Sequence, residues 1–412
     1  MAPERHRAAA MAPQRRSAPL FRPWAVLASL AVADGTVRGK VRPSPGCWNS
    51  DSPAFAPAHS FVKRTILVHD YELVTRRFVV QMPSAAPWGK GGPAPAPLLV
   101  GIHGQTGEAE SFGKDHNFTL LGHGLMAVFP QGMDDSEPGA DRGTGWNVGS
   151  AGDAAGGMTC IPQGVGQSGG CYKSCRALNR CGRCNWSTCY NDVLFIKQVL
   201  NAVTSEFCID LNRVYLMGES NGAQLVHHLV SEMPGTFAAA VPWYGLPLVG
   251  FLLGADSRLL KHRKAHESTV FMAIHGRQDV TIPVNGGVSE DGWIFNTEAQ
   301  VLGVWTAFHG CDETSSPMKT PFDGGKENFQ CVRWTGCKTG RDVVYCDYDG
   351  EHGDWPTANH GDAVTLSFML QYSLAGDVDH SGKEDMSAYS DDDDETLYST
   401  QDEEVNSMDT IV

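Results

Sequence analysis

Several features are scarce in this 412-residue chain. Only 19% of its residues are charged, whereas 42% are apolar, so wholesale disorder is excluded and a sizeable core is expected. No internal repeat is found. The apolar run at residues 24–32 is shorter than the ~20 residues that cross a bilayer, so we expect no membrane span.

A basic block is also lacking outside the amino terminus. The net charge is −15, and the segment 377–412 alone holds 13 acidic residues and one basic residue. Residues 1–33 hold five arginines and one glutamate. With no basic surface left to neutralise phosphates, we expect no nucleic-acid partner. We expect 377–412 to be a solvated acidic tail.

One fragment of that tail resembles part of a calcium loop. Asp377, Asp379, Ser381 and Gly382 match positions 1, 3, 5 and 6 of an EF-hand, but position 12, normally a bidentate glutamate, is Ala388. The loop is incomplete, so we favour a plain acidic tail over specific calcium binding.

The amino terminus predicts a secretory signal peptide at residues 1–33. Arginines precede the apolar run, and Ala31-Val32-Ala33 offers small residues at the cleavage positions. A transit peptide is the alternative, because the stretch is rich in arginine and nearly free of acidic residues. Met11 is a second candidate start. Sequons at Asn117 and Asn185 are compatible with a secreted, extracellular glycoprotein.

Cysteine is abundant. Twelve cysteines, an even number, follow the signal and predict disulfides. Six lie between Cys160 and Cys189, inside a Gly- and Cys-rich insertion at 134–190. A zinc site would use the pairs at 171/175 and 181/184. We favour a cross-linked surface loop, because thiolate zinc sites belong mainly to reducing compartments.

The segment from about residue 60 to 372 alternates short apolar runs with amphipathic stretches. Strands are predicted at 98–102, 125–129, 214–217, 237–244, 270–274 and 343–348. Helices are predicted at 191–206, 223–233, 298–309 and 363–372. Alternation of this kind indicates an α/β fold with a mostly parallel central sheet and helices on both faces.

The motif Gly218-Glu219-Ser220-Asn221-Gly222 lies between a predicted strand and a predicted helix. In that context G-x-S-x-G is a nucleophile elbow, a tight turn that holds the serine hydroxyl out at the top of the sheet. We therefore expect Ser220 to be a catalytic nucleophile; the alternative is a serine that only caps the helix.

A serine nucleophile needs a base, and the base needs an orienting acid, in the chain order Ser, Asp or Glu, His. Asp279 follows the strand at 270–274 and is the expected acid, with Asp256 and Asp291 as weaker candidates. His352 follows the last strand and is the expected base. His360, the second choice, resembles the start of the final helix. His275 precedes the acid and is expected to pack or hydrogen-bond within its own turn.

An acyl-transfer intermediate also needs two donors for its oxyanion. We expect the backbone N–H of Asn221 and that of Gln105, with Gly104 as the next choice after Gln105. Trp146 and Trp355 are candidate substrate-binding walls, although packing explains either equally well. The chemistry requires no metal and no organic cofactor.

Together these motifs resemble those of the feruloyl esterases and poly(3-hydroxybutyrate) depolymerase-like carbohydrate esterases of the α/β-hydrolase superfamily. The resemblance covers roughly residues 46–372. It includes Ile102-His103-Gly104, Gly145-Trp146-Asn147, the elbow, His275-Gly276-x-x-Asp279-x-x-Ile282-Pro283 and Tyr348-Asp349-Gly350-Glu351-His352. It implies an α/β-hydrolase domain over 34–376 that acts through Ser220, Asp279 and His352.

The resemblance also implies a substrate. A secreted serine esterase would hydrolyse feruloyl-type phenolic esters of plant or algal cell-wall polysaccharides, as small molecules or on the polymer. The alternatives are a polyhydroxyalkanoate depolymerase or an acetyl esterase, a peptidase on the same triad, or a disulfide-linked binding protein on a hydrolase scaffold. The insertion at 134–190 and the acidic tail depart from the family pattern. The sequence gives no oligomeric state.

Overall fold

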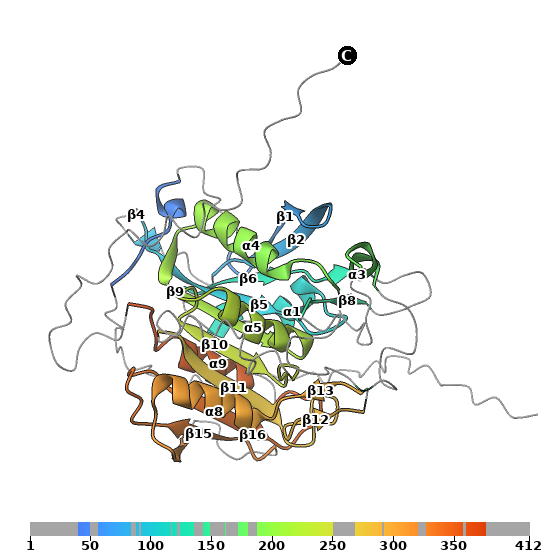
Figure 1. Ribbon diagram of the computed structural model, residues 1–412. Coiled ribbons are helices and arrows are strands. Elements are labelled where there is room, and N and C mark those ends of the chain that lie inside the picture. The colour runs from blue at the N-terminus through green and yellow to red at the C-terminus, as the bar shows by residue number, and fades with distance from the viewer. Residues whose placement is uncertain are drawn as a thin grey trace, which may run out of the picture. The chain divides into compact units, whose positions relative to one another are not determined.

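A ten-stranded sheet forms the centre of the computed structural model (Figure 1). The structure describes residues 40–49, 57–83, 88–89, 92–116, 118–121, 124–135, 143–148, 161, 172–179, 188–249, 268–290, 292–319, 327–356 and 360–375. The strands of the large sheet are β1 (Phe61–His69), β2 (Leu73–Gln81), β5 (Ala96–Ile102), β6 (Met126–Pro130), β9 (Ile209–Glu219), β10 (Ala239–Trp243), β11 (Val270–Gly276), β14 (Ser315–Met318), β15 (Gln330–Trp334) and β16 (Val343–Tyr348).

The strand order is β1-β2-β6-β5-β9-β10-β11-β16-β15-β14. The six strands from β6 to β16 in that order run parallel, while β1, β2, β15 and β14 pair antiparallel at the two edges. After β5 the chain forms β6, which lies between β2 and β5. It then passes to β9 on the other side of β5 and continues strand by strand toward β16. This is the strand order of an α/β-hydrolase, and the predicted fold class is confirmed.

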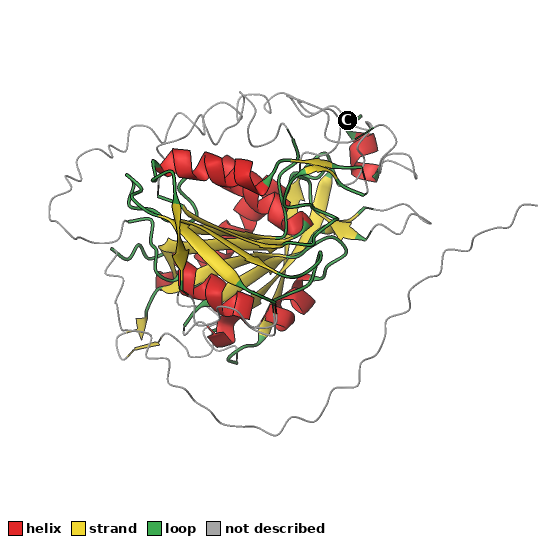
Figure 2. Ribbon diagram, turned by 90° about the horizontal axis from the view of Figure 1, so that it is seen from below, coloured by secondary structure: helices red, strands yellow, loops and turns green. Residues whose placement is uncertain are grey.

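Helices cover both faces of the sheet (Figure 2). On one face α4 (Asp192–Glu206), α5 (Asn221–Glu232) and α8 (Glu298–His309) share a hydrophobic core with the strands. On the other face α1 (Ala109–His116), α2 (Phe118–Leu121) and α9 (His360–Met369) do the same. All seven residues of β5 and of β11 are buried, as expected for strands covered on both sides.

Smaller elements decorate this framework. They are the 3-10 helix η1 (Pro45–Trp48), helix α3 (Lys173–Ala177) and the two-stranded pairs β3 (Trp88–Gly89) with β4 (Gly92–Pro93), β7 (Met133–Asp134) with β8 (Thr144–Gly145), and β12 (Gly287–Val288) with β13 (Ile294–Phe295). No helix in the described ranges has the length and apolarity that a membrane crossing requires.

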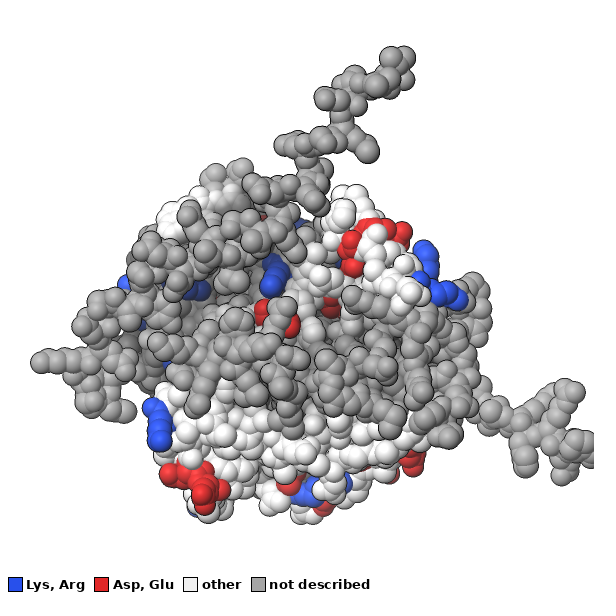
Figure 3. Space-filling view, in the orientation of Figure 1, with Lys and Arg blue, Asp and Glu red and all other residues white. Residues whose placement is uncertain are grey.

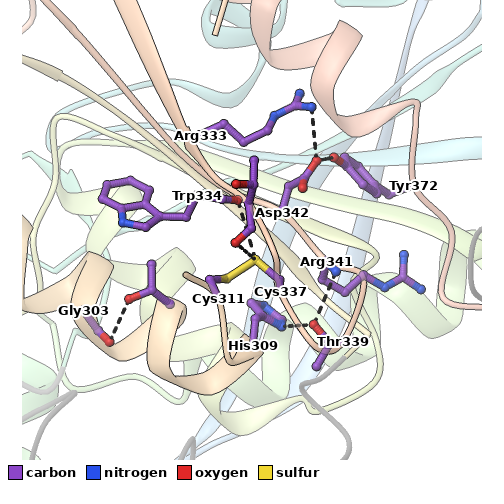
Figure 4. The surroundings of a disulfide bond; sticks show 12 residues. Gly303, His309, Cys311, Arg333, Trp334, Cys337, Thr339, Arg341, Asp342 and Tyr372 are labelled. Atoms are coloured by element: carbon purple, nitrogen blue, oxygen red, sulfur yellow. Dashed lines mark hydrogen bonds and ion pairs between the residues drawn. A yellow bond between two sulfur atoms is a disulfide. The ribbon is translucent and has the colours of Figure 1, made fainter. Parts of the chain in front are cut away.

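The eight cysteines in the described segments all form disulfides, which confirms that part of the prediction. The bonds join Cys47 to Cys208, Cys175 to Cys189, Cys311 to Cys337 and Cys331 to Cys346. Figure 4 shows the third bond beside His309, whose Nδ1 lies 2.9 Å from the Thr339 hydroxyl. Because Cys175 is oxidised, it cannot serve as a thiolate ligand, so the zinc alternative loses one of its four sulfurs.

Several predictions concern residues outside the described ranges. These are the signal peptide and Met11, both sequons, the acidic tail with its calcium-like fragment, Asp256, Asp291, the remaining four cysteines and most of the insertion at 134–190. Among the residues described on the face in Figure 3, acidic and basic side chains occur as small separate groups with uncharged surface between them.

Candidate active site

Ser220 lies on the sharp turn between β9 and α5. Its backbone has φ 50° and ψ −119°, a conformation that a residue with a side chain rarely adopts. The turn is tight because a Cβ at Gly222 would lie 2.4 Å from the carbonyl oxygens of Ile102 and His103. Only glycine lets the helix come this close to β5. The elbow geometry expected from the motif is therefore present.

The loops after β11 and β16 bring an acid and a base to this serine. The Ser220 hydroxyl lies 2.9 Å from His352 Nε2, and His352 Nδ1 lies 2.7 Å from Asp279 Oδ2. Since Nδ1 faces a carboxylate, the ring carries its hydrogen there, and Nε2 can accept the serine proton. The Asp279 side chain is fully buried, whereas that of His352 is 21% exposed.

Asp279 receives three hydrogen bonds. Besides His352, the Ile282 N–H donates to Oδ1 at 2.8 Å, and His275 Nε2 lies 3.2 Å from Oδ2. Burial opposes ionisation of this carboxyl group, but the bonds from His275 and His352 lower its pKa to about 2. The acid is therefore a carboxylate throughout the neutral range.

His275 links Asp279 to a second carboxylate. Its Nδ1 lies 3.1 Å from Glu298 Oε2, and its Nε2 also lies 2.9 Å from the Ile282 carbonyl oxygen. Burial by itself would lower the pKa of His275, but its bonds and charge interactions with Asp279 and Glu298 raise it to about 9. The expectation that His275 hydrogen-bonds within its own turn is confirmed, and its contact with Glu298 was not predicted.

The loop after β5 lies against the nucleophile, where an oxyanion donor is needed. A Cβ built at Gly104 would lie 3.3 Å from the Ser220 Cβ. The Gly104 N–H donates to Glu219 Oε1 at 3.3 Å, so this amide is engaged by the residue next to the nucleophile. Glu219 Oε2 also accepts a short hydrogen bond from the Tyr244 hydroxyl. This arrangement favours Gln105 over Gly104 as the donor from the loop.

Two further side chains hold that loop in shape. His103 is buried; Gly132 N–H donates to its Nε2 at 2.9 Å, and its Nδ1 lies 2.7 Å from the Gly104 oxygen. Burial lowers the pKa of His103 to about 4, so the ring is neutral. Trp146 donates from Nε1 to the His103 oxygen at 2.8 Å, and its N–H donates to the Asn221 side chain.

The two tryptophans proposed as substrate walls differ in exposure. Trp146 is fully buried, so its ring supports the loop and has no surface with which to line an open pocket. Trp355 is partly exposed and stacks on Trp243. Trp355 and Tyr244 line a cavity of about 280 Å³ beside the catalytic histidine loop. Trp355 therefore remains the candidate for substrate contact.

A larger cavity of about 510 Å³ lies elsewhere, between the β1–β2 turn and the start of α4. The smaller cavity is lined by Glu219 and Gly353, the chain neighbours of Ser220 and His352, whereas the larger one is lined by no residue next to the triad, so the smaller cavity is the better candidate for the site. Within the described residues, no group of three or more His, Cys, Asp or Glu side chains is arranged to hold a metal ion.

Sequence reasoning missed three groups that the structure places around the triad. Glu219 occupies a variable position of the elbow motif, so the motif carried no signal for it. Glu298 is the first residue of α8, where an acidic residue is common because it interacts favourably with the helix dipole. Tyr244 follows a buried strand and looked like part of its apolar run. His360 does start α9, as expected.

Several known esterases are similar to this chain. No family model matches the chain. It is 24% identical to feruloyl esterase B of Piromyces equi over 310 residues, covering 73% of this chain and 46% of that protein. It is also 24% identical to acetylxylan esterase A of Aspergillus oryzae over 306 residues, covering 70% and 77%.

The chain spans about half the length of the first curated relatives that it matches. One of them is the probable feruloyl esterase C of Aspergillus clavatus, which is 24% identical over 40% of this chain and 51% of that protein. Among solved structures, it matches an acetyl xylan esterase from Aspergillus awamori with a TM-score of 0.45 and 14% identity, over 76% of this chain and 99% of that one. The predicted resemblance to feruloyl esterases and other carbohydrate esterases is confirmed, and none of these relatives is named a poly(3-hydroxybutyrate) depolymerase.

Proposed function

We propose that the protein is a serine carboxylic ester hydrolase. The observation that carries the proposal is the line of hydrogen bonds from Ser220 through His352 to Asp279, at 2.9 and 2.7 Å, on a strained elbow. A hydroxyl, a neutral imidazole and a buried carboxylate in this order form the device that activates a serine at neutral pH.

The steps follow from the geometry. Ser220 Oγ attacks the ester carbonyl carbon as its proton moves to His352 Nε2. Asp279 stabilises the imidazolium that forms. The N–H groups of Asn221 and Gln105 hold the oxyanion. His352 then gives its proton to the departing alcohol, and an acyl-enzyme remains. Water repeats the sequence, releasing the acid and restoring Ser220.

The proposed substrates are esters on plant or algal cell-wall polysaccharides, above all feruloyl-type phenolic esters, so that the protein takes part in polysaccharide degradation. The names of the feruloyl esterase relatives support this class. The partly exposed ring of Trp355 beside the histidine loop offers an aromatic surface for a phenolic acyl group.

An acetyl ester is the second candidate. The acetylxylan esterases are matched over 77% of their length, more than the first feruloyl esterases. A cavity of about 280 Å³ is small for a phenolic acid together with a sugar, which also favours a short acyl group. The polyester depolymerase and binding-protein alternatives have no comparable observation in their favour.

We also propose that the protein is secreted and that the segment 34–376 is the esterase domain. Four disulfides in the described residues support an oxidising compartment, where such bonds form and persist.

The test compares wild-type protein with Ser220→Ala on p-nitrophenyl acetate, methyl ferulate and acetylated xylan. We expect hydrolysis by the wild type and a loss of at least ~10³-fold in the variant, because the nucleophile is gone. The ratio of ferulate to acetate turnover then separates the two substrate classes. A folded wild-type protein that hydrolyses none of these esters, or a fully active variant, would refute the proposal.

A further inference from the structure

We propose that His275 and Glu298 extend the triad: His275, held as a cation between Glu298 and Asp279, is a positioning residue that fixes the catalytic carboxylate and tunes the base. The inference rests on the proposed function, since it concerns the same site. It assigns a role to two buried groups that the three-residue mechanism does not use.

Three oxygen atoms surround the nitrogens of the His275 ring. Nδ1 faces Glu298 Oε2 at 3.1 Å, and Nε2 faces both Asp279 Oδ2 at 3.2 Å and the Ile282 oxygen at 2.9 Å. All three are acceptors. A neutral imidazole has one donor and one acceptor nitrogen and would leave one of these oxygens facing a lone pair. With both carboxyl groups ionised, the geometry therefore calls for hydrogen on both nitrogens.

The three side chains of this array are deeply buried. His275 is 1% exposed, Asp279 4% and Glu298 5%. Two carboxylates enclosed so deeply without a cation would repel each other and resist ionisation. Glu298 Oε1 is buried and has no hydrogen-bond partner among the described residues, so His275 is the one described group that bonds this carboxylate's side chain. The start of α8 adds a favourable helix dipole.

Other titratable groups pack near this array without replacing His275. Asp347, the register neighbour of His275 on β16, pairs with Arg277 at 2.7 Å, and this arginine also pairs with Asp349. Nearby phenols interact electrostatically with the carboxylates, and burial raises the pKa of each: Tyr244, Tyr345 and Tyr348. They stay uncharged, so among these groups the positive charge that faces Asp279 in the resting enzyme comes from His275.

The consequence for catalysis has two parts. His275 anchors Asp279 Oδ2, the same oxygen that His352 uses, and so fixes the direction of the base. Its positive charge also opposes protonation of His352, which keeps the base free in the resting enzyme. A role in packing alone would affect stability and turnover but would not set the pH at which the base works.

Two variants separate these parts. In Glu298→Gln the ring can turn neutral, accept from the new amide and still donate to Asp279, so orientation survives and the cation is lost. We expect kcat within about threefold and the acidic limb of the kcat/KM profile moved upward by about one pH unit. In His275→Asn both the cation and the bond that orients Asp279 are lost. We expect a larger upward shift than in Glu298→Gln, because the negative charge of Glu298 stays, with kcat about 10- to 100-fold lower and KM nearly unchanged.

His309→Asn is the matched control. His309 is another fully buried histidine; it ends α8, at the opposite end from Glu298, and it bonds Thr339 near the Cys311–Cys337 disulfide (Figure 4). We expect lower stability and an unmoved pH profile. If the control shifts the acidic limb as far as the two test variants, or if neither test variant shifts it, the proposal is overturned.

A readout that needs no substrate keeps this proposal apart from the proposed function. Nitrogen NMR of the full-length protein labelled in histidine should show one ring, absent in His275→Asn, with both nitrogens protonated at pH 7. A neutral His275 ring would refute the inference even in an active esterase. A cationic ring in a protein that hydrolyses no ester would refute the proposed function alone.

Discussion

Replacing Glu219 by alanine tests how the oxyanion loop is held. In the structure its carboxylate accepts from the Gly104 N–H at 3.3 Å and from the buried Tyr244 hydroxyl. The variant frees both donors. Since Gly104 precedes Gln105, the proposed oxyanion donor, release of this amide lets the donor drift from its position.

The magnitude follows from that contact. Loss of one oxyanion donor costs about 10²–10³ in kcat, and because a 3.3 Å bond is already long, we expect the lower end, ~10². The orphaned Tyr244 hydroxyl adds about 1–3 kcal/mol of lost stability. Glu219→Gln is the control: its amide oxygen still accepts one bond, so kcat should fall less than about tenfold.

The assay is steady-state hydrolysis of p-nitrophenyl acetate, with urea unfolding of each variant in parallel. A kcat unchanged or raised in Glu219→Ala would refute the reasoning. It would mean that Glu219 competes for the Gly104 amide and that Gly104, the second choice from the sequence, is the oxyanion donor.

Three other predictions concern stability and can be checked by urea unfolding. Arg76→Met should lower the free energy of unfolding by about 3–5 kcal/mol, because it leaves the buried Asp192 carboxylate without its ion-pair partner. A double variant with Asp192→Leu that recovers none of this stability would contradict the prediction. Removing the Cys47–Cys208 disulfide by paired serine substitutions should cost about 5 kcal/mol, more than the ~3 kcal/mol for the disulfide between β15 and β16, since it closes 161 residues rather than 15. The pKa of His275 is raised from 6.5 to about 9, so its contribution of about 3 kcal/mol to the free energy of unfolding is full below pH 6.5 and is lost as the pH rises to 9. His275→Asn should therefore flatten the fall of the unfolding free energy between pH 6.5 and 9. An unchanged fall would argue against a cationic ring.

The sequence predicted best where a single physical pattern dominates. β16 and α8 begin and end where apolar spacing placed them, and β5, β6 and α5 differ by only a few residues. The edge strands β1 and β2 were not predicted. They carry several charged residues, including Arg76, whose burial depends on Asp192 at 2.7 Å, 116 positions along the chain. A contact of that range leaves no local periodicity to detect.

The same distinction explains the site. Ser220, Asp279 and His352 each follow a recognisable strand, so chain order alone pointed to them, and the structure brings them within hydrogen-bonding distance. Glu219 and Glu298 act through contacts with other loops. Their neighbours are set by the parallel pairing of β9 with β5 and by the packing of α8, which spacing does not specify.

The charges along the extended array show why a triad acid this deeply buried needs a cation behind it. In the proposed resting array, Glu298 and Asp279 are negative, His275 is positive and His352 is neutral, so the array carries one net negative charge. When His352 takes the serine proton, the charges alternate and the array becomes neutral, which matches the transition state better than the ground state. Without His275 the resting array would carry two negative charges, which would favour the imidazolium form of His352. The imidazolium would then be stabilised more strongly, but less free base would be present at a given pH. His275 removes half of that charge, and the base stays available at neutral pH.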